Sequence, residues 1–293
     1  MKLKRPVTEV ITARTSRRRY EERPIDGESR GVLEDFLSSE AATAVPFDTA
    51  LRFELVAATE GDRSALRGLG TYGMIRGAPG FVVGAVSPSW KDMEDYGYAM
   101  ERIILLATDL GLGTCWLGGT FTKSSFASKI STQEQEVVPA VAAIGHATEQ
   151  RGAMDKVIRW GAGSKKRRPW EELFYAESFT NPLTSSSAGE LATPLEMVRR
   201  APSASNKQPW RVVASADGTT AHFFLQRDPQ YNRNIKTMQL ADLQRIDMGI
   251  GMCHFELTVR EQGLEGAWST DSPDIGRLPP GTEFITSWTR SDH

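Results

Sequence analysis

The sequence predicts an α+β fold in which two pseudo-repeats occupy one chain of 293 residues. The first observation is a repeated pattern: residues 97–116 and 249–268 both fit Gly-x2-Met-x4-Leu-x5-Gly-Leu-x3-Trp, with six identities in register. Identities at a constant offset indicate a duplicated structural unit. The second observation is that segments with strand character lie beside segments of helical periodicity in both halves. Two unrelated amphipathic helices that both end in Gly-Leu remain the alternative.

The first half is expected to span residues 1–178. A helix is expected over residues 27–44, directly after Asp26. Strands are expected over residues 51–58, 77–86 and 136–147. Both copies of the repeat have the apolar spacing of a helix, and Gly111 and Gly263 are expected to end these helices as left-handed caps.

The second half is expected to span residues 179–293, and the Ser-, Thr-, Gly- and Pro-rich segment 177–194 is the expected linker. Thr193 is expected to cap a helix that runs to Ala201. Two strands are expected within residues 210–227, around a turn at Asp217-Gly218. The two halves are expected to pack as one compact unit.

Composition excludes several classes of function. The formal net charge is −2, so no global field favours nucleic acid or an anionic membrane. No apolar run has the length of a transmembrane helix or the form of a signal peptide, which predicts a cytoplasmic protein. Two cysteines are too few for a disulfide framework, and four scattered histidines give no metal-ligand spacing. We therefore expect no metal site.

Two basic clusters are candidate anion sites. The segment "ARTSRRRYEERPI", residues 13–25, packs four arginines around Thr15 and Ser16. Residues 165–168, "KKRR", form the second cluster. Guanidinium groups make bidentate, charge-assisted hydrogen bonds to phosphate, although either cluster alone is also typical of a solvated charged surface.

Two further segments suit a flat polar ligand. In "GLGTCWLGG", residues 111–119, the last two glycines allow backbone N–H groups to approach a ligand closely, although a tight turn explains them equally well. The segment "APSASNKQPWRVV", residues 201–213, is dense in hydroxyl and amide side chains. Such groups satisfy a buried polar ligand that needs many donors and acceptors.

Together these three segments resemble the signature segments of the FMN-dependent nitroreductase family. The resemblance covers most of the chain and implies an α/β/α sandwich. Enzymes of that family are usually homodimers whose two FMN sites are each built from both subunits. Here the Arg-rich segment occurs only in the first half and "APSASNKQPW" only in the second. The chain thus resembles a fused-dimer branch, in which two pseudo-repeats mimic the family homodimer and form one intact site.

The resemblance also implies which residues hold the cofactor, although it assigns no catalytic residue. Arg18 would face the N1/C2 edge of the flavin ring, and Lys165 and Arg167 would lie near the phosphate. Gln208 and Trp210 would anchor their loop rather than touch the cofactor. The full implied FMN-binding set is Arg14, Thr15, Ser16, Arg18, Leu117, Gly118, Gly119, Lys165, Arg167, Pro202, Ser203, Ala204, Ser205 and Asn206.

The function implied is ping-pong transfer of hydride from NADH or NADPH through FMN to a nitroaromatic, a quinone or a similar electron-poor acceptor. Residues that could shape the substrate side are Tyr72, Phe121, Tyr231 and His254. A flavin-binding sensor or carrier without turnover, and a dehalogenase-like enzyme of the same fold, remain alternatives. We expect a small-molecule acceptor as the partner, with no nucleic acid and no membrane. Because the chain resembles a fused dimer, a monomer is plausible.

Overall fold

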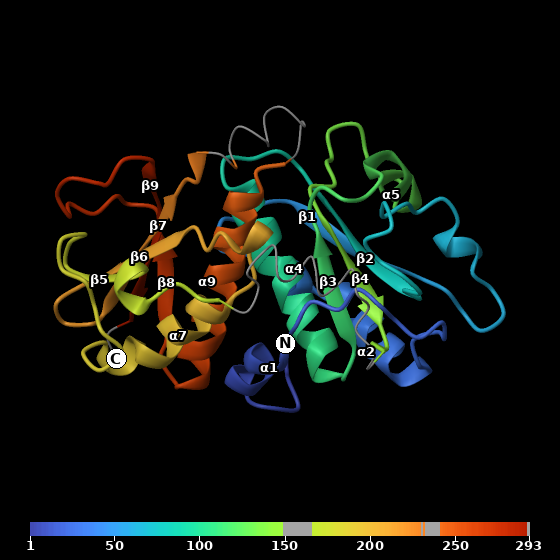
Figure 1. The fold of residues 1–293 in the computed structure, drawn as a ribbon, viewed down its shortest axis with the longest axis horizontal. Helices are drawn as coiled ribbons and strands as arrows, with labels where there is room; N and C mark the ends of the chain where they lie inside the picture. Colours follow the sequence, from blue (N-terminus) through green and yellow to red (C-terminus); the bar gives the residue numbers. More distant parts are fainter. Residues whose placement is uncertain (149–165, 230, 232–240, 292–293) are drawn as a thin grey trace.

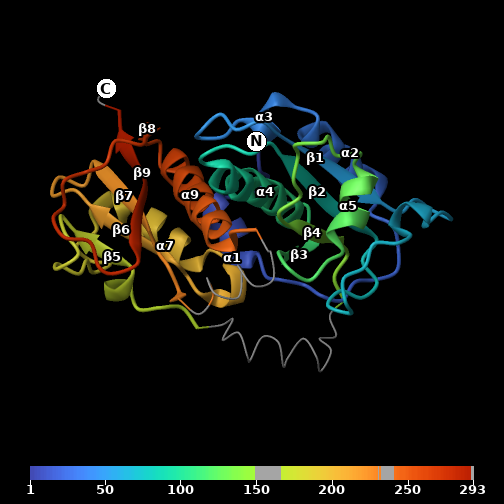
Figure 2. The same cartoon turned by 90° about the horizontal axis from the view of Figure 1, so that it is seen from above.

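The computed structural model of the protein describes residues 1–148, 166–229, 231 and 241–291. Two long helices, α4 (Asp92–Asp109) and α9 (Leu243–Glu261), run side by side through the centre, and a sheet lies on each outer side of the pair (Figures 1 and 2). None of the helices in the described ranges combines the length and apolar character needed to cross a membrane.

The first sheet has four antiparallel strands in the order β1-β2-β4-β3. Their bounds are β1 Leu51–Ala57, β2 Gly80–Val86, β3 Gly113–Leu117 and β4 Val141–Gly145. Strands β2 and β4 are buried at every position, because helices cover both faces of the sheet. The strands expected from the sequence are therefore present, although all three are shorter than predicted.

The other helices of this half are α1 Val7–Ala13, α2 Gly27–Leu37, α3 Glu40–Thr43, α5 Lys123–Lys129 and the 3-10 turn η1 Ser64–Leu66. Elements α2, α3, α5 and η1 pack against the first sheet, whereas α1 packs against α4, α7 and α9. The single helix expected over residues 27–44 is divided into α2 and α3. Asp26 caps α2, since its carboxylate accepts a hydrogen bond from the Ser29 N–H at 2.9 Å.

The second sheet has the order β5-β6-β7-β9-β8 and is antiparallel except for the parallel pair β5-β6. Its strands are β5 Phe174–Ala176, β6 Trp210–Ala214, β7 Thr220–Gln226, β8 Gly266–Ser269 and β9 Thr282–Arg290. The expected hairpin within residues 210–227 is thus β6 and β7. Because β5 already belongs to this sheet, the second sheet begins a few residues before position 178.

Helix α7 (Ala192–Arg200) leads into the Ser- and Asn-rich loop. It continues from the 3-10 turn η3 (Gly189–Leu191), and Leu191 occupies the N-cap position without a side-chain cap. The prediction that Thr193 caps this helix was wrong. The N-cap is Leu191, two residues before Thr193, because the 3-10 turn leads directly into α7, and Thr193 lies inside the helix. Two more 3-10 turns, η2 Trp170–Glu172 and η4 Ala204–Asn206, complete this half.

The first glycine of each repeat lies where α4 and α9 cross. A Cβ atom on Gly97 would lie 2.1 Å from the carbonyl oxygen of Ile246, and one on Gly249 would lie 1.9 Å from that of Glu94. Each glycine therefore faces the carbonyl three residues before the other glycine, which is a reciprocal arrangement. The helices are in backbone contact, and only glycine fits at either position.

Candidate functional site

A cavity of about 380 Å³ lies between the two halves, a volume within the range of ordinary small-molecule sites. Segments that follow α1, β3 and α7 meet there with one face of α9. Its lining residues are Ser16, Arg18, Trp116, Gly118, Gly119, Thr120, Ala140, Pro202, Ser203, Ala204, Ser205, Tyr231, Leu243, Ile246, Asp247 and Ile250. Eight of the fourteen residues implied by the family resemblance are in this set.

The Arg-rich segment after α1 runs beside β3 as an extended chain. Ser16 forms a parallel bridge with Thr114, and the Arg17 N–H donates to the Thr114 carbonyl at 2.8 Å. Alternate side chains of an extended segment point to opposite sides. Ser16 and Arg18 accordingly line the cavity, whereas Thr15 and Arg17 do not.

Strand β3 and the loop after it form another part of the wall. The same alternation directs Trp116 to the cavity, while Leu117 is buried in the separate apolar cluster on the other face of the sheet. Gly118 and Gly119 both line the cavity. A Cβ atom on Gly118 would lie 2.5 Å from Cδ1 of Leu243, so a glycine allows this turn to pack against α9.

The loop after α7 supplies four lining residues, 202–205. Ser205 and Asn206 have left-handed φ angles of 50° and 55°, which are uncommon for residues other than glycine. Backbone strain of this kind concentrates at functional sites, where the surrounding contacts hold it in place. Asn206 points away from the lining set: its Oδ1 accepts from Arg167 Nη1 at 2.8 Å, and its Nδ2 donates to the Lys166 carbonyl at 2.9 Å.

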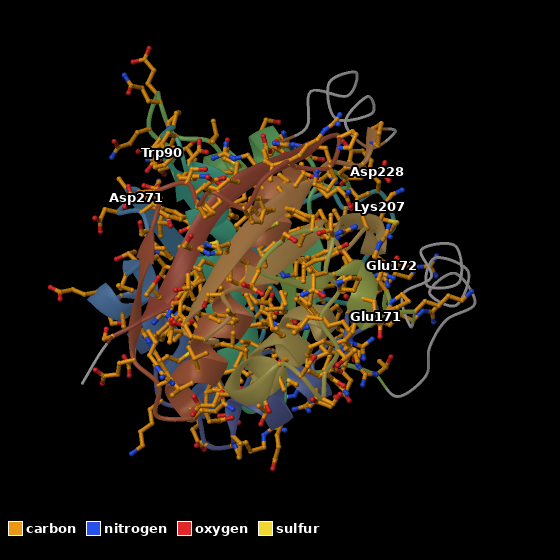
Figure 3. All side chains as sticks on the ribbon, turned by 90° about the vertical axis from the view of Figure 1, so that its left-hand side faces the viewer. Trp90, Glu171, Glu172, Lys207, Asp228 and Asp271 are labelled. Atoms are coloured by element: carbon orange, nitrogen blue, oxygen red, sulfur yellow. The ribbon has the colours of Figure 1, made fainter. Side chains whose placement is uncertain are left out.

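Gln208 and Lys207 anchor this loop. Gln208 is buried, and its Oε1 accepts from the Arg168 N–H at 2.9 Å while its own N–H donates to Ser203 Oγ at 2.9 Å. Lys207 Nζ lies 2.9 Å from Asp228 Oδ2, and the two side chains are neighbours near the end of the second sheet where β6 begins and β7 ends (Figure 3). The anchoring role expected for Gln208 is therefore present.

A group of arginines lies behind the cavity wall. Arg14 is buried and forms an ion pair with Glu101, in which Nε lies 3.7 Å from Oε1, too far for a hydrogen bond. Burial, followed by the charges of Arg14, Arg199 and Arg200, lowers the pKa of Arg167 to about 10. Because the positive charges of neighbouring arginines repel one another, a bound anion beside them would be stabilised. Lys165, also implied by the resemblance, lies outside the described residues.

Sequence reasoning missed the wall that α9 provides. Leu243, Ile246, Asp247 and Ile250 follow the spacing i, i+3, i+4, i+7, which places them on one helical face. Asp247 is 3% exposed, and its Oδ1 accepts from the Ala204 N–H at 2.9 Å. Burial raises the pKa of Asp247 well above its ordinary value. A carboxyl in an apolar helical stripe was the signal that could have found it.

Glu101 joins several elements beneath the cavity. It is fully buried; its Oε2 accepts from Trp116 Nε1 at 2.7 Å, and its Oε1 lies 3.0 Å from His254 Nε2. His254 Nδ1 is 2.9 Å from the Met197 carbonyl on α7. This chain of contacts connects α4, β3, α9 and α7, so His254 has a place in the core rather than in the lining.

The other side chains considered for the substrate side are divided between surface and core. Tyr231 lines the cavity. Tyr72 is 73% exposed, and Phe121 is buried in the apolar cluster on the far face of the first sheet. Of the four candidates, Tyr231 is thus the one that the structure brings to the cavity.

A family model described as "Putative TM nitroreductase" matches residues 6–259, a range that includes every residue lining the cavity. The chain belongs to this nitroreductase family. A similarly described protein from Thermotoga maritima has a crystal structure that aligns with 99% of this family member and 95% of its own chain, at 18% identity and a TM-score of 0.60. That likeness shows a nitroreductase fold.

Two solved structures are described with FMN. A nitroreductase from Bacteroides fragilis with bound FMN aligns with 50% of this nitroreductase-family chain and 91% of its own, at 25% identity and a TM-score of 0.39. An FMN complex from Desulfovibrio desulfuricans aligns with 52% of this chain and 95% of its own, at 21% identity and a TM-score of 0.38. No curated protein sequence matches the chain.

Proposed function

We propose that this nitroreductase-family protein binds one FMN in the cavity and passes hydride from NADH or NADPH to an electron-poor acceptor such as a nitroaromatic or a quinone. One observation carries the proposal: segments 16–18, 116–120 and 202–205, which are far apart in the sequence, form one cavity with α9. These are the segments in which the sequence resembles the family's FMN site.

The residues present fit such a cofactor. Arg18 and the hydroxyls of Ser16, Ser203 and Ser205 supply donors and acceptors at the cavity wall, as a buried pyrimidine ring and ribityl chain require. Arg14 Nε is buried without a hydrogen-bond partner among the described residues, and Arg167 lies close enough to feel its charge. A phosphate group beside these two arginines would relieve their mutual repulsion.

Each wall would contribute by positioning and by electrostatics. When bound, FMN supplies the hydride chemistry. Arg18 would stabilise negative charge at the ring edge, and Trp116, Leu243 and Ile250 would exclude water from one side of the cavity. The two glycines after β3 would let backbone approach the ring closely.

We also propose that the chain arose by internal duplication and acts as a fused pair. The reciprocal contacts of Gly97 and Gly249 support this, because they place the two halves about a local two-fold relation at the helix crossing. The Arg-rich segment and the Ser/Asn loop each occur in one half alone, so one complete site is expected. Cytoplasmic location and action as a monomer remain predictions.

The test is the visible spectrum of the purified protein, before and after NADH or NADPH is added without oxygen. Bleaching of bound flavin, followed by recovery when a nitroaromatic or quinone is added, is the expected result. A flavin that neither nicotinamide reduces would favour a sensor or carrier. A protein that takes up no FMN at all would refute the proposal.

Arginine variants locate the site, with a matched control on the neighbouring residue. Arg18→Ala should raise the Kd for FMN by about 10- to 100-fold, since a charge-assisted hydrogen bond contributes about 1.5–3 kcal/mol. Arg17→Ala removes the same charge from the opposite side of the extended segment and should leave the Kd nearly unchanged. Equal losses in both variants would mean that overall charge, and not this cavity, attracts the cofactor.

A further inference from the structure

Asp247 connects α9 to the loop that covers the cavity. Its two carboxyl oxygens lie 2.9 and 3.1 Å from the Ala204 nitrogen, so both share one N–H donor. Asp247 and Ala204 both line the cavity. Because Ser205, the next residue, has a strained left-handed conformation, a fixed contact at Ala204 helps to hold the loop in its shape.

The corresponding residue of the first repeat makes a different set of bonds. Asp95 also stands two residues before the crossing glycine, and its oxygens accept from the Phe47 N–H at 3.1 Å and the Thr49 N–H at 3.0 Å. Each oxygen of Asp95 thus has its own donor, and Asp95 is not a lining residue. Asp247 has one donor for two oxygens within the described part of the chain, so hydrogen-bonding capacity is left at the cavity.

The surroundings of Asp247 favour its neutral form. It is almost completely buried among apolar lining residues, which raises its pKa. The negative charge of Asp242, the N-cap of α9, raises the pKa of Asp247 further. The two oxygens of Asp242 accept hydrogen bonds from the Arg245 N–H and from Arg227. A carboxyl group that keeps its proton can donate a hydrogen bond to a ligand acceptor.

Building on the proposed function, we propose that Asp247 is a positioning residue for the flavin: it holds loop 202–205 against the cavity through the Ala204 N–H and presents its remaining hydrogen-bonding capacity to the polar edge of the bound ring. The ligand class that this carboxyl fits is a heterocycle with carbonyl or ring-nitrogen acceptors, not an anion. The arginines described above serve the anionic end of the cofactor, whereas Asp247 serves a neutral polar edge.

The experiment compares FMN binding to the full chain and to three variants, by titration at a temperature well below unfolding. Asp247→Ala should raise the Kd for FMN by about tenfold or more, the loss expected when a buried hydrogen bond is removed. Asp247→Asn keeps an acceptor for the Ala204 N–H and a donor for the cavity, so its Kd for FMN should stay within about threefold of the wild-type value. Asp95→Ala is the matched control: it breaks the equivalent contacts of the other repeat and should leave the Kd within about threefold of wild type.

The visible absorption bands of bound FMN provide a second readout, because they respond to hydrogen bonds at the ring. They should shift in Asp247→Asn relative to wild type and stay unchanged in Asp95→Ala. Wild-type affinity in Asp247→Ala, or an equal loss in Asp95→Ala, would overturn the inference while the proposed function stands. If the wild-type chain itself takes up no FMN, the proposed function fails, and the inference fails with it.

Discussion

Replacement of Gly249 by alanine should separate the two central helices. The added Cβ atom would lie 1.9 Å from the Glu94 carbonyl oxygen, which is backbone and cannot move without moving α4. Overpacking in a core costs about 1–3 kcal/mol when side chains can yield. Because a backbone group must move here by more than about 1 Å to reach ordinary contact, we expect a cost of about 3 kcal/mol or more.

Thermal unfolding followed by circular dichroism measures this effect. An unfolding entropy of about 2.1 cal/mol/K per residue converts 3 kcal/mol into a fall in Tm of about 5 °C for a chain of this size. Gly251→Ala is the matched control in the same helix, where the nearest atoms to an added Cβ are 3.6 Å away. It removes a helical glycine without a clash and should be neutral or stabilise by about 0.5–1 kcal/mol.

The comparison between the two variants decides the argument. If Gly249→Ala is as stable as Gly251→Ala, the helices do not cross in backbone contact at the repeated glycine. The reciprocal variant Gly97→Ala should behave like Gly249→Ala, since its Cβ would lie 2.1 Å from a carbonyl of α9. A mild effect at Gly97 beside a severe one at Gly249 would contradict the two-fold relation of the repeats.

Three further predictions follow from buried polar groups. Burial raises the pKa of Asp95 to about 6, so the folded state binds its proton more tightly than the unfolded state. As the pH falls from about 6 to 4, the free energy of unfolding of the wild type should rise by up to about 3 kcal/mol relative to that of Asp95→Asn. Urea unfolding across this range measures the difference, and a pH-independent difference would contradict the prediction. Glu101→Ala leaves Trp116 Nε1 buried without its acceptor and His254 Nε2 buried without its carboxyl partner, and should cost about 3–5 kcal/mol in thermal unfolding. A cost below about 1 kcal/mol would show that water replaces the carboxylate. Arg14→Ala combined with Arg18→Ala should release FMN, measured by gel filtration, while the far-ultraviolet circular dichroism stays that of the wild type; retained FMN would refute the placement of the cofactor.

Local patterns in the sequence were sufficient for much of the fold. The spacing of apolar residues predicted both central helices, and Gly111 and Gly263 end them with φ angles of 80° and 76°, as the caps required. The hairpin around Asp217-Gly218 was predicted by its turn residues. These features depend on backbone preferences of a few neighbouring residues, which the sequence displays directly. The division of residues 27–44 into two helices was missed, because helical periodicity does not mark a short break.

The sequence by itself therefore showed a repeated pattern, and it predicted the helix in each copy and three segments whose residues suit a cofactor site. Only the tertiary structure decided which side chains of those segments reach the cavity. Ser16 and Trp116 line it while their neighbours Thr15 and Leu117 do not, because the pairing of each extended segment with its sheet sets the direction of its alternate side chains. The wall that contains Asp247 likewise depended on how α9 packs against loops distant in the sequence. Contacts between residues far apart in the chain leave no pattern in the local sequence, so they can be identified only from the packing of the folded chain.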